Sequence, residues 1–465
     1  MLAYPIMPRK SLSVLLLLLT IHQQMLLPRD VQADQVEVDL GRKFSLIARM
    51  QLPLVHDYVV QRYIKKLGQK IVSHLKEPEF QYQFSVVQDD SLNAFSVPGG
   101  YLYFNSGLIL RVDSDDELAS VIGHEIAHVQ GHHMLRQQQD TKLLSYAGLA
   151  AMLLAIINPV LAAGASSAAG AIQMKYMRQL EEESDYRGLQ YMTQAGFDPH
   201  GMPRFLKKMS DEERLNAVHV PAYLRSHPIS QDRLSYIERI LGTMQWNQNS
   251  PTNTFELKRV QAILRTQSEH RSRLLDEYEQ RVKASPDDPQ ALALLGVIQS
   301  RFNDIEQAQK TLELAKTKGL QLDDELGAIY LRLGQRDKAR QSFARLSEID
   351  PTNADAHNQL CTIFWRDGEL ERAKNACQTA VELDPQFDEP YLTLAQIARQ
   401  QDRTSEARLL LAQAMELQGR PEAALNQYQL ALPLLDPNHL KTEEITKKIK
   451  ELEEFINELN KTGRR

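Results

Sequence analysis

Residues 123–132 read Gly-His-Glu-Ile-Ala-His-Val-Gln-Gly-His, and the interpretation of the whole chain starts from them. His124 and His128 are four residues apart, so on a helix they lie on one face, one turn from each other. Two imidazoles placed in this way supply two corners of a tetrahedral zinc site. Glu125 follows the first histidine, and its carboxylate can act as the general base toward a water at the metal. The stretch therefore predicts a hydrolytic zinc centre.

The residues before this stretch predict where its helix begins. Ser114 and Glu117 have the spacing of a capping box, with Ser114 at the N-cap. Apolar residues then follow at helical spacing: Leu118, Val121, Ile122, Ile126 and Val129. We therefore expect a buried helix that carries polar ligands. Met134 stands where the metzincin pattern has its third histidine, so the third ligand must come from elsewhere, and a carboxylate on a second helix is the expected source.

The N-terminal 33 residues have the features of a secretory signal. Arg9 and Lys10 precede an apolar run at 12–19, and Val-Gln-Ala at 31–33 is a small-residue cleavage site. The apolar run is short for a transmembrane helix, although an uncleaved anchor is the alternative. No cysteine stands at the cleavage site, which argues against a lipoprotein. The sequence thus predicts cleavage near Ala33 and export to an oxidising compartment.

Composition fits a folded, soluble chain of several domains. The 465 residues are 43% hydrophobic and 25% charged, and this length suggests two to three domains. The net charge is −6. It becomes −8 without residues 1–33, because that segment holds three basic and one acidic side chain. An acidic chain of this kind gives no indication of nucleic-acid binding.

Residues 34–110 mix helices and strands. We predict helices at 39–48 and 53–75 and a strand at 80–87 from their apolar spacing. Residues 93–104 contain Pro-Gly-Gly at 98–100 before a β-rich run, which predicts a hairpin immediately before the metal helix. A strand at the edge of a protease cleft can pair with an extended substrate. A purely structural hairpin is the alternative.

Residues 143–174 contain no charged side chain. Their length would permit a membrane span, but Asn158-Pro159 interrupts the run and its second half is rich in Ala, Gly and Ser. Two short helices, either buried or in peripheral contact with a membrane surface, fit better than a full span.

The acidic stretch at 179–188 is the expected source of the third metal ligand. A glutamate here can complete the metal set. Asp185, one turn further on, can accept the N–H of a ligand histidine and so orient it. The alternative is a solvated acidic helix face, which is the usual meaning of three consecutive glutamates.

Three motifs together resemble the prenyl-protease/HtpX-type family of zinc metallopeptidases. They are His-Glu-Ile-Ala-His at 124–128, Glu-Glu-Glu-Ser-Asp at 181–185, and Asn-Ala-Phe…Pro-Gly-Gly at 93–100. The resemblance covers residues from about 50 to 240. The family often has Ala where Ser184 stands here.

Carried over by position, the resemblance implies a role for each site residue. His124, His128 and Glu181 would hold one zinc ion per chain, Asp185 would orient a ligand histidine, and Glu125 would be the general base.

A further segment at 226–233, Ser-His-Pro-Ile-Ser-Gln-Asp-Arg, resembles the family's His-Pro…Arg segment. His227 could polarise the substrate carbonyl or occupy the fourth position of zinc in a resting form. Arg233 could hold the acidic groups of the site or stabilise the oxyanion. A structural loop before a helix is the alternative for the whole segment.

From about residue 250 the sequence changes to helical repeats. Residues 254–283 are predicted to form one polar helix. Ala339, Ala373 and Ala407 are 34 residues apart, as are Gly334 and Gly368. This is the tetratricopeptide period, and such arrays bind proteins in a concave groove. Residues 441–460 predict a final charged helix that caps the array.

The only two cysteines, Cys361 and Cys377, fall on the two helices of one predicted repeat. In an oxidising compartment they can form a disulfide within that repeat, and two buried free thiols are the alternative.

These observations predict an α+β, mainly α chain. A zincin-type peptidase domain with a small sheet (34–250) follows the signal peptide (1–33). A helical linker (251–285) then leads to an α-solenoid of tetratricopeptide repeats (286–465).

The combination of export signal, peptidase and repeats is similar to periplasmic proteases with chaperone-like action on outer-membrane proteins. The resemblance implies that misassembled outer-membrane proteins are the substrates and that the repeats contact the outer-membrane assembly machinery. The alternative function is a repeat-based chaperone or scaffold in which proteolysis is secondary.

Overall fold

The computed structural model describes residues 30–137, 170–215, 222–228, 231–246, 254–437 and 440–462. The described residues do not include positions 1–29 of the predicted signal sequence. They also do not include most of the apolar segment at 143–174. The predicted cleavage and membrane contact of these segments therefore remain predictions. Across the described parts of the chain, no helix is both long enough and apolar enough to cross a membrane.

The N-terminal half is built on a three-stranded sheet with the order β1-β3-β2. Strand β1 (Gln83–Val87) pairs in parallel with β3 (Tyr101–Asn105), and β2 (Ala94–Val97) pairs antiparallel with β3. The predicted hairpin is thus formed by β2 and β3. Gly99 and Gly100 at its turn have φ values of +80° and +90°, which favour glycine. β2 is one of the two edge strands of this sheet.

In the described part of the chain two helices precede the sheet, and both differ at their ends from the prediction. Helix α2 spans Asp30–Gln51, longer than the predicted 39–48. Helix α3 spans Tyr58–Val72 and begins later than predicted, because Asp57 caps it by accepting the N–H groups of the next turn. Leu54, predicted as helical, instead forms a bridge with Val87.

The metal-ligand motif lies on α5 (Asp115–Gln130), whose N-cap is Ser114 as predicted. The Ser114 hydroxyl accepts the Glu117 N–H at 3.2 Å. The Glu117 carboxylate, however, accepts from the N–H of Asp113 rather than from the cap residue itself. Between β3 and α5 lies the short α4 (Ser106–Ile109), and α6 (His133–Gln137) follows α5.

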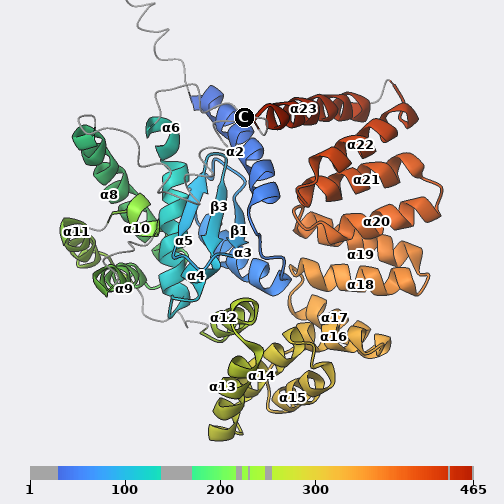
Figure 1. The fold of residues 1–465 in the computed structure, drawn as a ribbon, viewed down its shortest axis with the longest axis horizontal. Helices are drawn as coiled ribbons and strands as arrows, with labels where there is room; N and C mark the ends of the chain where they lie inside the picture. The colour runs from blue at the N-terminus through green and yellow to red at the C-terminus, as the bar shows by residue number, and fades with distance from the viewer. Residues whose placement is uncertain are drawn as a thin grey trace, which may run out of the picture.

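Helix α5 is the centre of the peptidase half (Figure 1). It packs against β2 and α3 on one side, and against α8 (Gly170–Gln194) and α9 (Gly201–Leu215) on the other. Nearly all its side chains are buried, including those of Asp115, Asp116 and Glu117 in its first turn. The short α10 (Ala222–Ser226) and α11 (Gln231–Leu241) complete this half.

Residues 254–284 form two helices where the sequence predicted one. α12 (Thr254–Ser268) and α13 (Arg271–Ala284) are separated by a break at residues 269–270. α12 is also not a polar helix: Leu257, Val260 and Ile263 are buried in the main core. It packs against α3 of the peptidase half and against α14 of the repeats. Because two sides of α12 are buried, its apolar residues are not confined to one helix face.

Helix pairs of the tetratricopeptide type follow. They are α14 (Pro289–Arg301) with α15 (Ile305–Thr317), α16 (Asp323–Arg332) with α17 (Arg336–Ile349), α18 (Ala354–Arg366) with α19 (Leu370–Leu383), and α20 (Glu389–Gln400) with α21 (Thr404–Leu417). α22 (Pro421–Ala431), the 3-10 turn η3 (Leu432–Leu434) and α23 (Leu440–Thr462) end the array. Gly334 and Gly368, predicted from the repeat period, have φ values of +72° and +80° and end α16 and α18.

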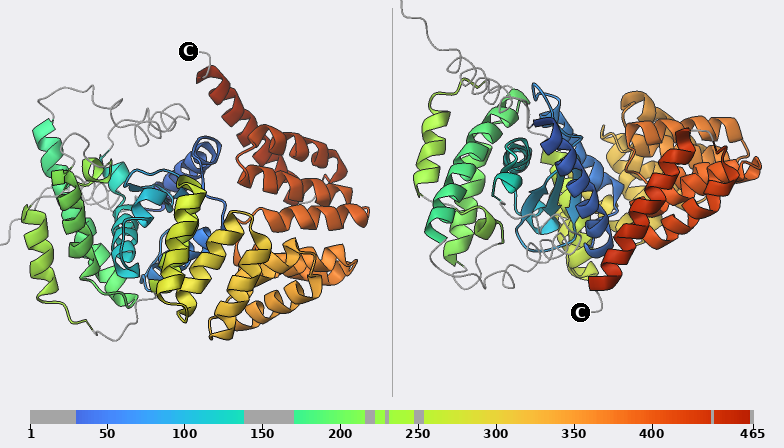
Figure 2. Two further views of the ribbon diagram at one scale, coloured as in Figure 1. Left: turned by 60° about the horizontal axis from the view of Figure 1, so that its bottom comes forward. Right: turned by 90° about the horizontal axis from the view of Figure 1, so that it is seen from above.

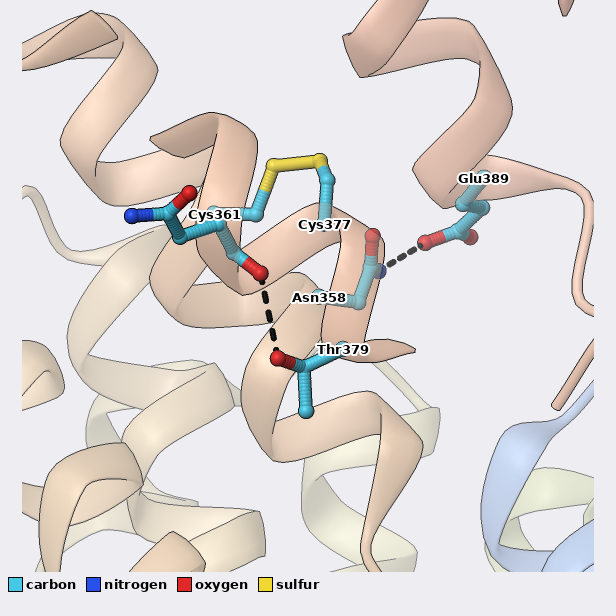
Figure 3. The surroundings of a disulfide bond; sticks show 6 residues. Asn358, Cys361, Cys377, Thr379 and Glu389 are labelled. Carbon is cyan, nitrogen blue, oxygen red and sulfur yellow. Dashed lines mark hydrogen bonds between the residues drawn. A yellow bond between two sulfur atoms is a disulfide. The ribbon is translucent and has the colours of Figure 1, made fainter. Parts of the chain in front are cut away.

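A disulfide joins Cys361 on α18 to Cys377 on α19 (Figure 3). Both side chains are fully buried at the interface of the two helices. Of the two states that the sequence allowed, the structure has the bonded one.

The repeats curve back to the peptidase half (Figures 1 and 2). The Tyr58 ring of α3 lies 5.0 Å from the Phe387 ring, between centroids, in the loop before α20. Lys65, on the same helix, pairs with Asp384 at 2.7 Å. The array therefore contacts the peptidase half along its inner side as well as through the chain connection.

Candidate metal centre

His124 and His128 point from α5 to one place, as their spacing predicted. Their Nε2 atoms lie 3.0 Å apart, and His124 is 2% exposed. This burial removes water from the imidazoles, so any cation bound there is held by protein groups in a site of low polarity.

Glu181 reaches the two histidines from α8. Its Oε2 lies 3.4 Å from His124 Nε2, and its Oε1 lies 3.4 Å from His128 Nε2. The approach depends on two facing glycines: a Cβ on Gly123 would come within 2.9 Å of the Gly188 carbonyl oxygen. The absence of side chains at this crossing lets α5 and α8 pack backbone against backbone.

His227, just after α10, supplies a fourth ligand atom. Its Nδ1 lies 3.0 Å from Glu181 Oε1 and 3.3 Å from His124 Nε2. One atom from each of His124, His128, Glu181 and His227 lies within 4.8 Å of the others. Four ligands at zinc–nitrogen distances in a tetrahedron are separated by roughly 3.3–3.4 Å. Three imidazoles and one carboxylate at these separations therefore fit a tetrahedral divalent cation.

The charges around the site favour a cation. Burial by itself raises the pKa of Glu181. The charges of His227 and Arg233, together with hydrogen bonds from the two α5 histidines, outweigh burial and hold this pKa well below its ordinary value. Burial lowers the pKa of His124, but hydrogen bonds to Asp185 and Glu181 outweigh burial and raise this pKa to about 9. The first shift keeps Glu181 ionised beside the positive groups, and the second shows that the two carboxylates attract positive charge to the His124 ring.

Asp185 and Arg233 surround the metal-facing groups. Asp185 Oδ1 accepts from His124 Nδ1 at 3.0 Å. Arg233 donates from Nε and Nη2 to the same Asp185 carboxylate at 2.5 and 2.8 Å, and its Nη1 lies 2.9 Å from Glu181 Oε2. Arg233 therefore contacts both acidic groups of the site, and its role remains a prediction.

Glu125 lies on α5 beside the ligand cluster. Its carboxylate is 1% exposed, and its Oε2 accepts from the Ser96 hydroxyl at 2.8 Å. Its Oε1 has no hydrogen-bond partner among the residues that the structure describes. A buried carboxylate oxygen without a donor is costly, and such groups are retained where a reaction uses them. The Oε1 atom lies 3.4 Å from His227 Nε2, beside the cluster.

Three residues at the site were not singled out from the sequence. Ser96 binds Glu125 from the edge strand β2. His133 Nδ1 lies 2.9 Å from His128 Nδ1, and burial lowers the pKa of His133 to about 3. The Tyr223 ring lies 4.7 Å from the His227 ring at 34°. Ser96 stood within the quoted hairpin motif and His133 directly after the metal-ligand motif, but no local signal indicated Tyr223.

Comparison with known proteins agrees with this geometry. Residues 59–241 match the model of peptidase family M48. Residues 325–386 and 364–425 match tetratricopeptide-repeat models. Among solved structures, the tetratricopeptide-repeat protein YrrB aligns with 37% of this chain and 91% of its own, at a TM-score of 0.31 and 19% identity.

Several bacterial proteins are similar to this chain. The β-barrel assembly-enhancing protease of Escherichia coli K12 is 29% identical over 352 residues, which are 73% of this chain and 72% of that protein. The protein of that name from Yersinia pestis is 34% identical over 207 residues, or 43% and 42% of the two chains. A Vibrio cholerae relative given the name provisionally is 36% identical over 43% of each chain, so these last two matches span less than half of the relatives' length.

A mitochondrial relative matches a shorter part of the chain. The metalloendopeptidase OMA1 of Arabidopsis thaliana is 30% identical over 182 residues, which are 39% of this chain and 36% of that protein. The chain therefore carries a metallopeptidase domain of family M48 followed by C-terminal tetratricopeptide repeats.

Proposed function

We propose that this chain is a periplasmic, zinc-dependent endopeptidase with chaperone-like action in the assembly or quality control of outer-membrane proteins. The observation that carries the proposal is the position of Glu125 Oε1 beside a cluster of three histidines and Glu181. This buried carboxylate oxygen has no hydrogen-bond donor within the described parts of the chain.

His124, His128 and Glu181 would hold the ion. When bound, zinc supplies a Lewis acid that makes water nucleophilic near neutral pH. Asp185 keeps the Nδ1 proton of His124 in place, so the Nε2 lone pair of that ring faces the site. Arg233 neutralises Asp185 and Glu181, which lets two carboxylates remain ionised side by side.

Glu125 would move the proton. The Ser96 hydroxyl holds Oε2, which leaves Oε1 to take a proton from the attacking water and to return it to the leaving amine. The ring of His227 stands between Oε1 and the ligand atoms, and it would have to withdraw before a peptide carbonyl could enter. After withdrawal, its imidazole could polarise that carbonyl.

The edge strand β2 is the expected binding place of the substrate. It carries Ser96 beside Glu125, and its outer edge is not paired with another strand of the described sheet. An extended polypeptide added to this edge would present its backbone next to the base. Unfolded or misassembled strands of outer-membrane proteins have the conformation that such an edge accepts, and the names of the relatives agree with this class of substrate.

The repeats would recruit the outer-membrane assembly machinery or the substrates themselves. The alternative is that they form a chaperone or scaffold in which proteolysis is secondary. A specific observation favours a low basal activity: a ring nitrogen of His227 lies with the other candidate ligand atoms, and its Nε2 lies 3.4 Å from Glu125 Oε1.

Glu125→Gln tests the proposal. We expect this variant to lose cleavage of an unfolded protein substrate while it keeps the fold and the zinc content of the parent chain. A scaffold role should survive the substitution, so suppression of an assembly defect by Glu125→Gln would favour the alternative. Cleavage that persists in the variant would refute the assignment of Glu125.

A further inference from the structure

Helix α2 contacts the β2–β3 hairpin through close backbone packing. A Cβ on Gly41 would overlap the Pro98 carbonyl oxygen, and its distance from the Tyr101 ring would be 2.8 Å. A Cβ on Gly99 would lie 2.8 Å from the Glu37 carbonyl oxygen. Glycine at both positions allows the helix to lie directly on the turn of the hairpin, so the position of α2 and that of the turn are coupled.

The two faces of β2 divide their contacts between α2 and the metal helix. Phe95 and Val97 belong to an apolar cluster with Phe44 of α2. Ser96 lies between them and points the other way, where it donates to Glu125. Because alternate side chains of a strand point to opposite faces, any shift of β2 relative to α2 also shifts Ser96 relative to the base.

Aromatic contacts reinforce the α2 side of the hairpin. The Phe44 ring lies 5.9 Å from that of Tyr103 on β3 and 6.4 Å from that of Phe95 on β2. Phe95 and Tyr103 are stacked at 5.0 Å across the two strands. A single α2 residue thus contacts both strands of the hairpin.

Helix α23 reaches α2 from the end of the repeat array. Phe455 is fully buried in the same cluster as Phe44. One turn earlier, Glu451 accepts from Arg42 Nη1 of α2 at 2.8 Å. Figure 1 shows the C-terminal end of α23 beside α2. We call these contacts of Arg42, Phe44, Glu451 and Phe455 the α2–α23 interface.

The remainder of α23 packs on the repeats. Ile445, Ile449 and Leu452 belong to a separate apolar cluster with Ala424 and Tyr428 of α22. Helix α23 therefore has two apolar partners, the array along its N-terminal part and the peptidase half near its C-terminal end. The sequence predicted only the first of these, a cap of the array.

We propose that α23 is a positioning element for the substrate strand: through the α2–α23 interface it holds α2 on the hairpin and so keeps β2, with Ser96, in register with Glu125. The role of β2 rests on the proposed function, whereas the mechanical coupling does not. A second repeat contact acts in the same direction, since Arg49 of α2 donates to the Leu417 carbonyl oxygen at 2.7 Å.

The coupling can be measured without catalysis. In the full chain carrying Glu125→Gln, we compare Phe455→Ala with Ile445→Ala by hydrogen exchange and mass spectrometry. Both residues are buried on α23, at 0% and 5% exposure, but only Phe455 belongs to the cluster with α2. We expect Phe455→Ala to accelerate exchange of the amides of 94–105 by about tenfold or more. Equal exchange of this segment in the two variants would overturn the proposal.

A charge-reversal pair covers the case in which Phe455→Ala does not fold. Arg42→Glu should accelerate exchange at 94–105, and Glu451→Arg in the same chain should restore it, because the pair spans the α2–α23 interface. If Arg42→Glu accelerated exchange but Glu451→Arg did not restore it, the result would count against the coupling. Failure of the parent chain to cleave substrate would refute the proposed function and leave the exchange result as it stands.

Activity then tests the link to function. In chains with Glu125 intact, Phe455→Ala should lower kcat/KM for an unfolded protein by several-fold relative to Ile445→Ala, with the zinc content unchanged. Faster exchange at 94–105 together with unchanged kcat/KM would show that β2 is not the substrate strand and would overturn that part of the proposal.

Discussion

His227 Nε2 lies 3.4 Å from Glu125 Oε1, the oxygen of that carboxylate that accepts no hydrogen bond from any described residue. The other nitrogen of the same ring, Nδ1, lies 3.0 Å from Glu181 Oε1 among the ligand atoms. One imidazole thus covers both the base and the open side of the ligand cluster. Such an arrangement is expected of a resting form.

His227→Ala should raise basal proteolysis if the histidine occupies the fourth ligand position at rest. Removal of the ring frees both Glu125 Oε1 and the fourth position for water. The measurement is cleavage of an unfolded protein at equal zinc loading. The control is His200→Ala, because the His200 side chain is 54% exposed and contacts Asp198 and Trp246, which are not among the candidate ligands. Unchanged or lower activity of His227→Ala would count against a gating role.

Ser96→Ala should lower kcat by roughly tenfold, because a hydrogen bond to a charged group contributes about 1.5–3 kcal/mol. The Ser96 hydroxyl fixes Oε2 of Glu125 and so keeps Oε1 directed at the site. The variant loses this contact. Ser96→Thr keeps a hydroxyl on the strand and should restore most of the rate. Equal rates for the parent chain and Ser96→Ala, at equal zinc content, would show that the contact does not orient the base.

Asp355→Asn should stabilise the chain at pH 8 more than at pH 5. Burial, reinforced by the neighbouring carboxylates of Glu389 and Asp324, raises the pKa of Asp355 to about 7. The folded chain therefore keeps a proton that the unfolded chain releases above about pH 4, so stability falls as pH rises from about 4 to 7. An asparagine does not ionise, and its amide oxygen can still accept from Gln359, as the carboxylate does at 2.9 Å.

Urea unfolding at the two pH values measures this difference, which should be roughly 1–2 kcal/mol after allowance for partial exposure. The control is Asp337→Asn, at a side chain that is 89% exposed. If Asp355→Asn raised the free energy of unfolding by the same amount at pH 5 and pH 8, the pH dependence could not be assigned to this carboxyl group.

Reduction of the disulfide should lower the free energy of unfolding by roughly 3 kcal/mol, the value expected for a loop of this size. Cys361 and Cys377 are 16 residues apart and join the two helices of one repeat. Urea unfolding with and without reductant measures the loss. The urea unfolding of the double variant Cys361→Ala/Cys377→Ala should not change with reductant. If reductant destabilised this variant as much as the parent chain, the effect would not come from the disulfide.

The sequence alone was sufficient wherever the deciding residues lie within a few turns of one another. The four-residue spacings of His124 to His128 and of Glu181 to Asp185 place each pair on one helix face, whatever surrounds the helix. The 34-residue period, the glycines that end α16 and α18, and the hairpin with its Pro-Gly-Gly turn follow from the same local rules. The domain boundaries drawn from the sequence and the roles given to the site residues remain predictions.

Only the tertiary structure decided the relationships between distant segments. Glycines on α5 and α8 let Glu181 meet the two histidines, β2 brings Ser96 to Glu125, and α23 brings Phe455 to α2 from more than 400 residues away. The break between α12 and α13 and the two-sided burial of α12 were missed for the same reason. Periodicity reports the face that a helix buries, but not which neighbour covers it, because that choice depends on how the whole chain packs.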